Sequence, residues 1–372
     1  MELFLLLIVP LLIALGGFVA SAVSKNRRYL ITFREFLCIV GVVCAVIVLG
    51  YFISRMASTH DNEVWNGRVV KKEQERVSCE HSYTCNCMTI CSGSGSNESC
   101  TTVCQTCYEH ANDWDWALYT SNDERLEIDR IDRRGSKEPP RFTAAKKGDP
   151  TALVRSYTNY VKANPWSILR REGALEKFKS QIPAYPIDVR DYHYVDRFVN
   201  IGGKVPAAEL QAWNRDLMEI NADLGKKKQV NIVFVVTPTN DSSYIHALEE
   251  AWLGGKKNDL VVIFGVTEYP KIDWVRVMSW SRAEELKITL RDILQHDIGS
   301  LDKREAIISA TKELTERYFV RTRMREFEYL MAGVRPPTWA LVMLMIVGTG
   351  LSVGLTVYFW REDPFESGRE HW

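Results

Sequence analysis

Three stretches of this chain contain no charged residue, and each is long enough to cross a lipid bilayer. They are residues 3–23, 36–53 and 336–360. An α-helix needs about 20 apolar residues to span the hydrocarbon core. Trp339 lies near one end of the third stretch and Trp360 at the other, as in the aromatic belts of membrane interfaces. We therefore predict three transmembrane helices.

The first stretch also has some features of a signal peptide. Ala20 and Ala22 are small residues of the kind found at cleavage sites, but the preceding Met1-Glu2 lacks the basic residues of a signal peptide. We expect an uncleaved helix that is kinked at Pro10.

The distribution of basic residues predicts the orientation in the membrane. Short loops rich in lysine and arginine stay in the cytoplasm. The loop between the first two helices carries four such residues, Lys25, Arg27, Arg28 and Arg34. Residues 55–335 would then lie outside and the tail 361–372 inside. Four arginines before the third helix oppose this orientation, but long domains translocate largely regardless of charge. We predict an inner (plasma) membrane protein whose large domain is periplasmic or extracellular.

Seven of the nine cysteines lie in one short segment, "CEHSYTCNCMTICSGSGSNESCTTVCQTCYEH", residues 79–110. They are Cys79, Cys85, Cys87, Cys91, Cys100, Cys104 and Cys107. In an oxidising compartment such a cluster indicates a disulfide framework. Because seven is odd, one cysteine would stay free or bridge two chains. The spacing does not choose the pairing.

Zinc binding is the alternative interpretation of the cluster. His81 and His110 flank it and could complete a site, but a structural zinc site usually has two paired half-sites. This segment has a single CxxC, Cys104 to Cys107. Zinc would be favoured if the cluster lay in the cytoplasm as a zinc module. Otherwise we expect no cofactor.

The pattern between the second and third membrane spans predicts two folded regions. A cysteine-rich β module covers 56–150, with a strand at 64–70 and a hairpin at 114–131. A connecting region follows at 151–205. Residues 206–330 alternate helices with apolar strands, which indicates an α/β/α sandwich containing a βαβ unit. We expect strands at 230–238, 260–266 and 274–280, and helices at 206–224 (ended by Gly225), 242–253, 282–296 and 302–320. The fold class is an α+β membrane protein.

The α/β region resembles the TPM domain, a small module often tethered to membranes. The residues that carry the resemblance are "LGKKKQVNIVFVVT" (224–237) and "AWLGGKKNDLVVIFGV" (251–266). "TEYPKIDWVRVMSW" (267–280) departs from the glycine-bearing stretch of that family. TPM-like domains have been linked to phosphatase activity and metal binding. The resemblance thus implies a rival function, a membrane-tethered phosphate-ester hydrolase in which Asp241 and Asp259 hold a divalent metal.

The whole chain resembles uncharacterised membrane proteins of tailed bacteriophages. The resemblance rests on "VWNGRV", "EHSYTCNC", "CQTCYEH" followed by "DWDW", "IDRRGSKEPPRFT", "IPAYP" and "RPPTW". It implies a place in the host inner membrane with the large domain in the periplasm, and it implies no known activity.

Motifs that would indicate catalysis are missing from the sequence. It contains no HExxH, GxSxG, P-loop or GxGxxG pattern, so we expect a binding protein rather than an enzyme and assign no catalytic residue. The balance of 47 basic and 47 acidic residues argues against a nucleic-acid partner. The expected partners are the lipid bilayer and an envelope protein.

Two further features suggest contact surfaces. Five lysines precede the two apolar strands and could form a basic edge that meets anionic headgroups or an acidic partner. They are Lys226, Lys227, Lys228, Lys256 and Lys257. Gly350 and Gly354 form a small-xxx-small pair in the third membrane span. We expect this pair to pack within the chain, with a homo-oligomer as the alternative.

Overall fold

The computed structural model describes residues 2–23, 31–92, 99–164, 173–190 and 192–362. The chain forms two compact units, which are considered separately. The helical unit comprises Met1–Asp61, Ser156–Leu169 and Met324–Trp372, and the sheet unit comprises Asn62–Arg155 and Arg170–Arg323. The loop lysine and arginines that predict the orientation, Lys25, Arg27 and Arg28, lie outside the described residues.

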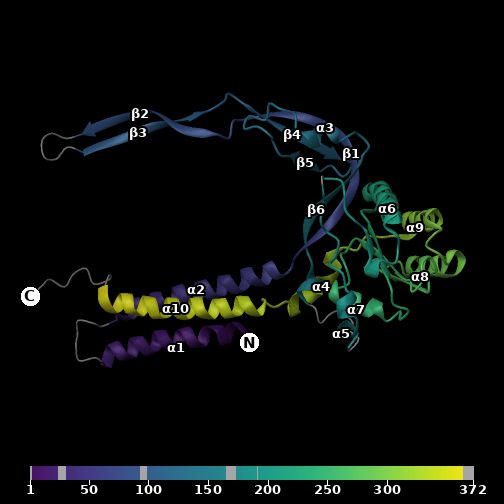
Figure 1. Ribbon diagram of the computed structural model, residues 1–372. Coiled ribbons are helices and arrows are strands. Elements are labelled where there is room, and N and C mark those ends of the chain that lie inside the picture. The colour runs from purple at the N-terminus through teal and green to yellow at the C-terminus, as the bar shows by residue number, and fades with distance from the viewer. Residues whose placement is uncertain (1, 24–30, 93–98, 165–172, 191, 363–372) are drawn as a thin grey trace, which may run out of the picture. The chain divides into compact units, whose positions relative to one another are not determined.

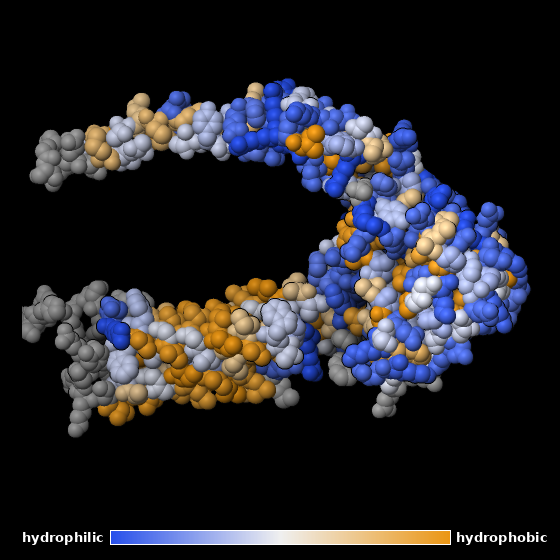
Figure 2. All heavy atoms as spheres, viewed as in Figure 1, coloured by the Kyte–Doolittle hydropathy of each residue, from blue (hydrophilic) through white to orange (hydrophobic). Residues whose placement is uncertain are grey.

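Three long apolar helices make up most of the helical unit. α1 (Glu2–Val23), α2 (Phe33–Ser58) and α10 (Thr338–Glu362) pack side by side (Figure 1). Each is long and apolar enough to cross a membrane. Their outward side chains are apolar as well, so the bundle presents a hydrophobic surface (Figure 2). Such a surface is stable in lipid and costly in water, which confirms the three predicted spans as membrane-associated helices.

Small residues spaced four apart allow these helices to approach closely. On α10, Gly348, Ser352 and Thr356 are buried, and the Ser352 hydroxyl donates a hydrogen bond of 2.6 Å to the Pro10 carbonyl on α1. Gly350 and Gly354 have open space where a Cβ would project, so they do not pack within the described chain. The predicted intramolecular contact is therefore wrong, because the packed stripe runs through Gly348 instead.

The first sheet of the sheet unit has strand order β5-β4-β1-β6. The strands are β1 (His60–Val77), β4 (Asp113–Thr120), β5 (Arg125–Ile128) and β6 (Pro150–Thr158). Trp116, Leu118 and Ile128 point into a small core, where the Trp116 ring packs edge-on against Phe142, 4.8 Å between centroids. The antiparallel β4–β5 pairing confirms the predicted hairpin. The structure also adds β6, which comes from the predicted connecting region.

The second sheet has strand order β10-β9-β8-β7. The strands are β7 (Phe198–Asn200), β8 (Asn231–Thr237), β9 (Asp259–Gly265) and β10 (Trp274–Met278). β7, β8 and β9 are parallel to one another, and β10 is antiparallel to β9. Both β8 and β9 are buried along their whole length, as expected for continuous apolar runs covered on two sides.

Helices cover both faces of this second sheet. Ile232, Phe234 and Val236 pack with α6 (Ala207–Lys228), α8 (Glu284–Asp292) and α9 (Arg304–Tyr318). Val233 and Val235 face the opposite side, where α5 (Ala174–Phe178) and α7 (Tyr244–Ala251) lie. Among the described residues, the remaining short helical segments are α3 (Pro140–Ala144), α4 (Tyr160–Ala163), η4 (Lys179–Gln181), η5 (Ile201–Gly203), η6 (Ile293–Ile298) and η7 (Met324–Gly333).

Gly225 lies inside α6 and does not end it. The sequence predicts a helix stop here, but α6 continues to Lys228. A Cβ at position 225 would lie 1.8 Å from the backbone oxygen of Asn66 on β1. The glycine therefore permits the close approach of β1 to α6.

We expect Gly225→Ala to destabilise the sheet unit by about 2 kcal/mol. A Cβ only 1.8 Å from a backbone oxygen places the cost of overpacking at about 3 kcal/mol, the upper end of the usual range. Replacing glycine within a helix returns about 1 kcal/mol, which leaves a net loss of about 2 kcal/mol. Urea unfolding of the full chain in detergent, followed by tryptophan fluorescence, measures the change. Lys226→Ala, at an exposed position of the same turn, is the control and should leave stability unchanged. A Gly225→Ala protein as stable as the wild type would contradict the close contact.

Candidate functional site

A two-stranded hairpin extends from the first sheet and is held together by three disulfides (Figure 1). Its strands are β2 (Ser82–Ser92) and β3 (Ser99–Tyr108). The bridges join Cys85 to Cys107, Cys87 to Cys104 and Cys91 to Cys100. The predicted disulfide framework is thus confirmed for six of the seven clustered cysteines. Residues 93–98 at the tip lie outside the described residues.

This hairpin is stabilised mainly by its disulfides, because it has no hydrophobic core among its described residues. An isolated two-stranded hairpin is at best marginally stable in water. The described residues of β2 are mostly exposed on both faces, so burial contributes little. Cross-links that close short loops restrict the unfolded chain and stabilise the paired state. They also indicate an oxidising compartment for this part of the protein.

One face of the hairpin carries three exposed apolar side chains. Met88 pairs with Val103, and Ile90 pairs with Thr101. Because side chains alternate along a strand, these residues share one face and the Cys91–Cys100 bridge lies on the other. Met88, Ile90 and Val103 are 67%, 55% and 54% exposed. Figure 2 shows apolar spheres along the hairpin. We call Met88, Ile90 and Val103 the apolar face.

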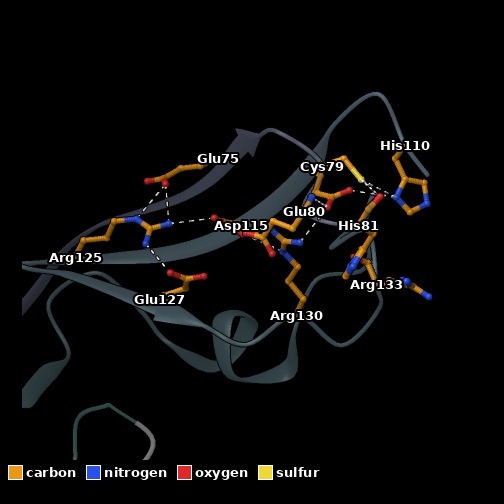
Figure 3. A network of polar contacts seen from close by, with 11 residues as sticks. Glu75, Cys79, Glu80, His81, His110, Asp115, Arg125, Glu127, Arg130 and Arg133 are labelled. Atoms are coloured by element: carbon orange, nitrogen blue, oxygen red, sulfur yellow. Dashed lines mark hydrogen bonds and ion pairs between the residues drawn. The ribbon is translucent and has the colours of Figure 1, made fainter. Parts of the chain in front are cut away.

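Three side chains that can bind metal meet at the root of the hairpin. Two of them, Cys79 and His110, are labelled in Figure 3. Cys79 lies between β1 and β2, His110 follows β3, and Asp113 begins β4. The Cys79 Sγ is 3.9 Å from the Nδ1 of His110, which is 3.2 Å from an Asp113 carboxylate oxygen. The three ligand atoms all lie within 4.8 Å of one another. We call these residues the root cluster.

The protein holds Asp113 of the root cluster firmly in place. Its side chain is fully buried, and its second carboxylate oxygen accepts hydrogen bonds from the Glu80 backbone amide (3.2 Å) and Arg130 (3.3 Å). Burial disfavours the charged form, but the Glu80 amide and Arg130 outweigh it and hold the pKa of Asp113 below its usual range. Arg130 also pairs with Asp115. The carboxylate is therefore ionised and oriented.

The root cluster is not arranged as a Cys–His–Asp catalytic triad. In a triad the nucleophile and the acid contact different nitrogens of the imidazole. Here both Cys79 and Asp113 approach Nδ1 of His110. All three side chains instead converge on a common point, which is the geometry of a ligand set.

The other predicted histidine does not join this set. The Nε2 of His81 lies 3.2 Å from the carbonyl of Arg133. Only the backbone oxygen of His81 reaches the cluster, 3.6 Å from the Cys79 Sγ. Of the two predicted histidine ligands, the structure thus groups only His110 with other possible metal ligands.

Asp241 lies in a separate surface hollow near the carboxyl end of β8. The hollow is lined by Lys177, Ser242, His246 and Arg276 among others. The Asp241 carboxylate pairs with Lys177 and accepts the backbone amide of Ser243 at 2.8 Å. The hydrogen bond from Lys177 is the largest cause of its lowered pKa. Asp241 thus binds the backbone of Ser243, the residue that immediately precedes α7.

Asp259 lies at the opposite end of the sheet. It begins β9, is buried, and accepts hydrogen bonds from the Tyr185 hydroxyl and the Asn231 amide. Burial raises its pKa to about 6. Because β8 and β9 are parallel, about 20 Å of strand separates Asp259 from Asp241. The predicted pair cannot hold one metal ion, and the hydrolase interpretation loses its proposed site.

Asp259 instead belongs to a buried polar network around Arg197. The Arg197 guanidinium donates to Asn231 at 2.9 Å and also to the side-chain oxygen of Asn66 on β1. Burial lowers the pKa of Arg197 to about 10. The network joins β1 to the second sheet, which indicates a structural role.

The five predicted basic-edge lysines lie before β8 and β9, and most have partners within the protein. Lys227 pairs with Glu316, and Lys228 donates to the Phe319 carbonyl. Lys257 pairs with the buried Glu63, and the Lys256 ammonium lies over the Tyr185 ring. Lys226 is exposed. Most of the predicted basic-edge lysines therefore make contacts within the protein itself.

Sequence reasoning missed the root cluster as a set. By its position in the sequence, Cys79 belongs with the disulfide candidates, and no sequence motif singles out Asp113. Two signals were present, namely the odd number of cysteines and the short spacing His110-x-x-Asp113. Neither signal shows that Cys79 lies beside these two residues, because that depends on how β1 pairs with β4.

Comparisons with known proteins find no family model, curated protein or solved structure that matches this chain. The resemblances to the TPM domain and to tailed-phage membrane proteins therefore stay predictions.

Proposed function

We propose that this chain is a membrane-anchored binding protein whose disulfide-stapled hairpin contacts an apolar surface on a partner protein of the cell envelope. The observation that carries the proposal is the rigid hairpin with the exposed side chains of Met88, Ile90 and Val103. Cross-links lower the conformational entropy that binding must remove, so a stapled hairpin is organised for contact before its partner arrives.

The composition of the hairpin favours a protein partner over a lipid surface. Residues 82–108 contain no lysine or arginine, and Glu98 is their only charged residue. Segments that bind membrane surfaces usually carry basic residues that attract anionic headgroups. Among the described residues, each strand of this two-stranded sheet also has one unpaired backbone edge, which a strand of another protein can extend.

The three apolar helices support anchoring in a membrane, and the disulfides support a position outside the cytoplasm. The plasma membrane as the site, the periplasm as the compartment and a phage origin are parts of the same proposal. They follow from the charge pattern and from the predicted resemblance.

Site-specific photocrosslinking in intact cells tests the function. A photoreactive residue at position 90 in the full chain should yield a discrete protein adduct. The same residue at Thr89, which faces the opposite side, is the matched control and should yield little. Adding Val103→Glu should abolish the adduct from position 90. An adduct of twice the chain mass would identify a second copy as the partner. Adducts to lipid alone, or equal yields from both faces, would contradict the proposal.

A further inference from the structure

We propose that Cys79, His110 and Asp113 bind one zinc ion, which clamps the root of the hairpin. The inference does not depend on the binding function of the apolar face. It rests on the convergence of a thiol, an imidazole nitrogen and a carboxylate oxygen within 4.8 Å.

The spacing of the three atoms suits a tetrahedral metal. With zinc bonds of about 2.3 Å to sulfur and about 2.0 Å to nitrogen and oxygen, ligand atoms lie roughly 3.3–3.6 Å apart. The observed separations are 3.9 Å for Cys79 to His110 and 3.2 Å for His110 to Asp113, and Cys79 lies within 4.8 Å of Asp113. Small side-chain adjustments are sufficient to bring the set to bonding distance.

The ligand types select zinc among the common divalent ions. Calcium and magnesium prefer sets made of oxygen ligands. Thiolate and imidazole suit zinc, which tolerates a carboxylate beside them. Zinc also has no redox chemistry of its own that would disturb the three nearby disulfides.

The surroundings of the cluster support binding. The carboxylate oxygen of Asp113 that does not face His110 is held by the Glu80 amide and by Arg130, as the outer hydrogen bonds of metal ligands usually are. Cys79 is 7% exposed, and the His110 side chain is 27% exposed. His110 therefore lies on the open side, where an ion can enter and water can supply the fourth ligand.

The position of the cluster gives the ion a structural role. Cys79 lies on the chain segment that enters the hairpin, and His110 lies on the segment that leaves it. Asp113 belongs to β4, which pairs with β1 in the first sheet. One ion would thus join both ends of the hairpin to the sheet. It would also explain why the seventh cysteine stays unpaired beside three disulfides, because a bound thiolate is protected from oxidation.

Metal titration of the full chain tests the proposal. The protein is purified in detergent without reductant, stripped with a chelator and titrated with zinc and then with cobalt. We expect one equivalent of either metal and, with cobalt, a sulfur-to-metal charge-transfer band. In the wild type, bound zinc should slow maleimide labelling of Cys79 at least tenfold, as read from the mass of its peptide.

Substitutions identify the ligands. Cys79→Ser, His110→Gln and Asp113→Asn should each weaken zinc binding at least tenfold. His81→Gln is the matched control and should bind as the wild type does. Retention of zinc by the Cys79→Ser protein, or cobalt binding without the thiolate band, would overturn the assignment. So would a Cys79 labelling rate that zinc does not change, and this measurement needs no variant. None of these results bears on crosslinking from position 90.

Discussion

Replacing Arg197 with methionine is expected to lower the free energy of unfolding of the sheet unit by roughly 2–6 kcal/mol. Methionine fills much of the volume but donates no hydrogen bond. The side-chain oxygens of Asn66 and Asn231 would then lose the guanidinium donor in a buried site. Each buried acceptor left without a donor costs about 1–3 kcal/mol. The buried Asp259 would also lose its nearby positive charge, which disfavours the ionised carboxylate further.

Urea unfolding of the full chain in detergent, followed by tryptophan fluorescence, measures this loss. Arg190→Met is the matched control, because Arg190 is exposed and pairs with Asp196 at the surface. Exposed ion pairs are worth about 0–1 kcal/mol, so the control should change stability little. If Arg197→Met and Arg190→Met have equal stabilities, the buried network does not join β1 to the second sheet.

Opening the three disulfides is expected to unfold the hairpin while the rest of the sheet unit stays folded. The bridges close short loops, with sequence separations of 22, 17 and 9 residues. Each such bridge typically contributes about 2–4 kcal/mol, whereas the uncross-linked hairpin has almost no stability of its own. Because each 1.4 kcal/mol changes an equilibrium tenfold, cleavage within 82–108 should accelerate at least a hundredfold.

Limited chymotrypsin digestion measures this effect, since Tyr83 and Tyr108 are exposed cleavage sites at the two ends of the hairpin. The digestion compares the wild type with a protein in which all six bridged cysteines are serine. Cys38→Ser combined with Cys44→Ser, in the membrane helix α2, is the control and should digest as the wild type does. Equal protection of the six-serine protein would show that the hairpin is held by contacts other than its bridges.

Features that depend on residues close together in the chain could be predicted from the amino-acid sequence alone. The three membrane helices followed from long charge-free runs, because nothing but a helix satisfies its own backbone in lipid. β8 and β9 followed from continuous β-branched runs, and the β4–β5 hairpin followed from alternation around a polar turn. The cluster of seven cysteines predicted disulfides, and its odd number predicted one cysteine without a partner.

Contacts between residues far apart in the sequence became visible only in the folded chain. The cysteine pairing depends on the register of β2 against β3, and the isolation of Cys79 depends on its place outside those strands. Small residues lie on two different faces of α10, and either face could pack against the other membrane helices. The face with Gly348 packs against Pro10 and Ile47, whereas Gly350 lies on the other face. Gly225 carries a strong local stop signal, but β1 passes so close to α6 that only a glycine fits.

The candidate sites follow the same division. Asp241 and Asp259 both lie next to strand ends in the sequence, and only the parallel pairing of β8 with β9 shows that these are opposite ends of the sheet. Cys79 and Asp113 are 34 positions apart and meet because β1 and β4 are antiparallel neighbours, with Val77 opposite Asp113. Local sequence patterns indicate which secondary structure a segment forms and which residues are buried. A binding site also requires side chains from distant segments to meet at one point. That point is fixed by strand order and register, which no short stretch of sequence encodes.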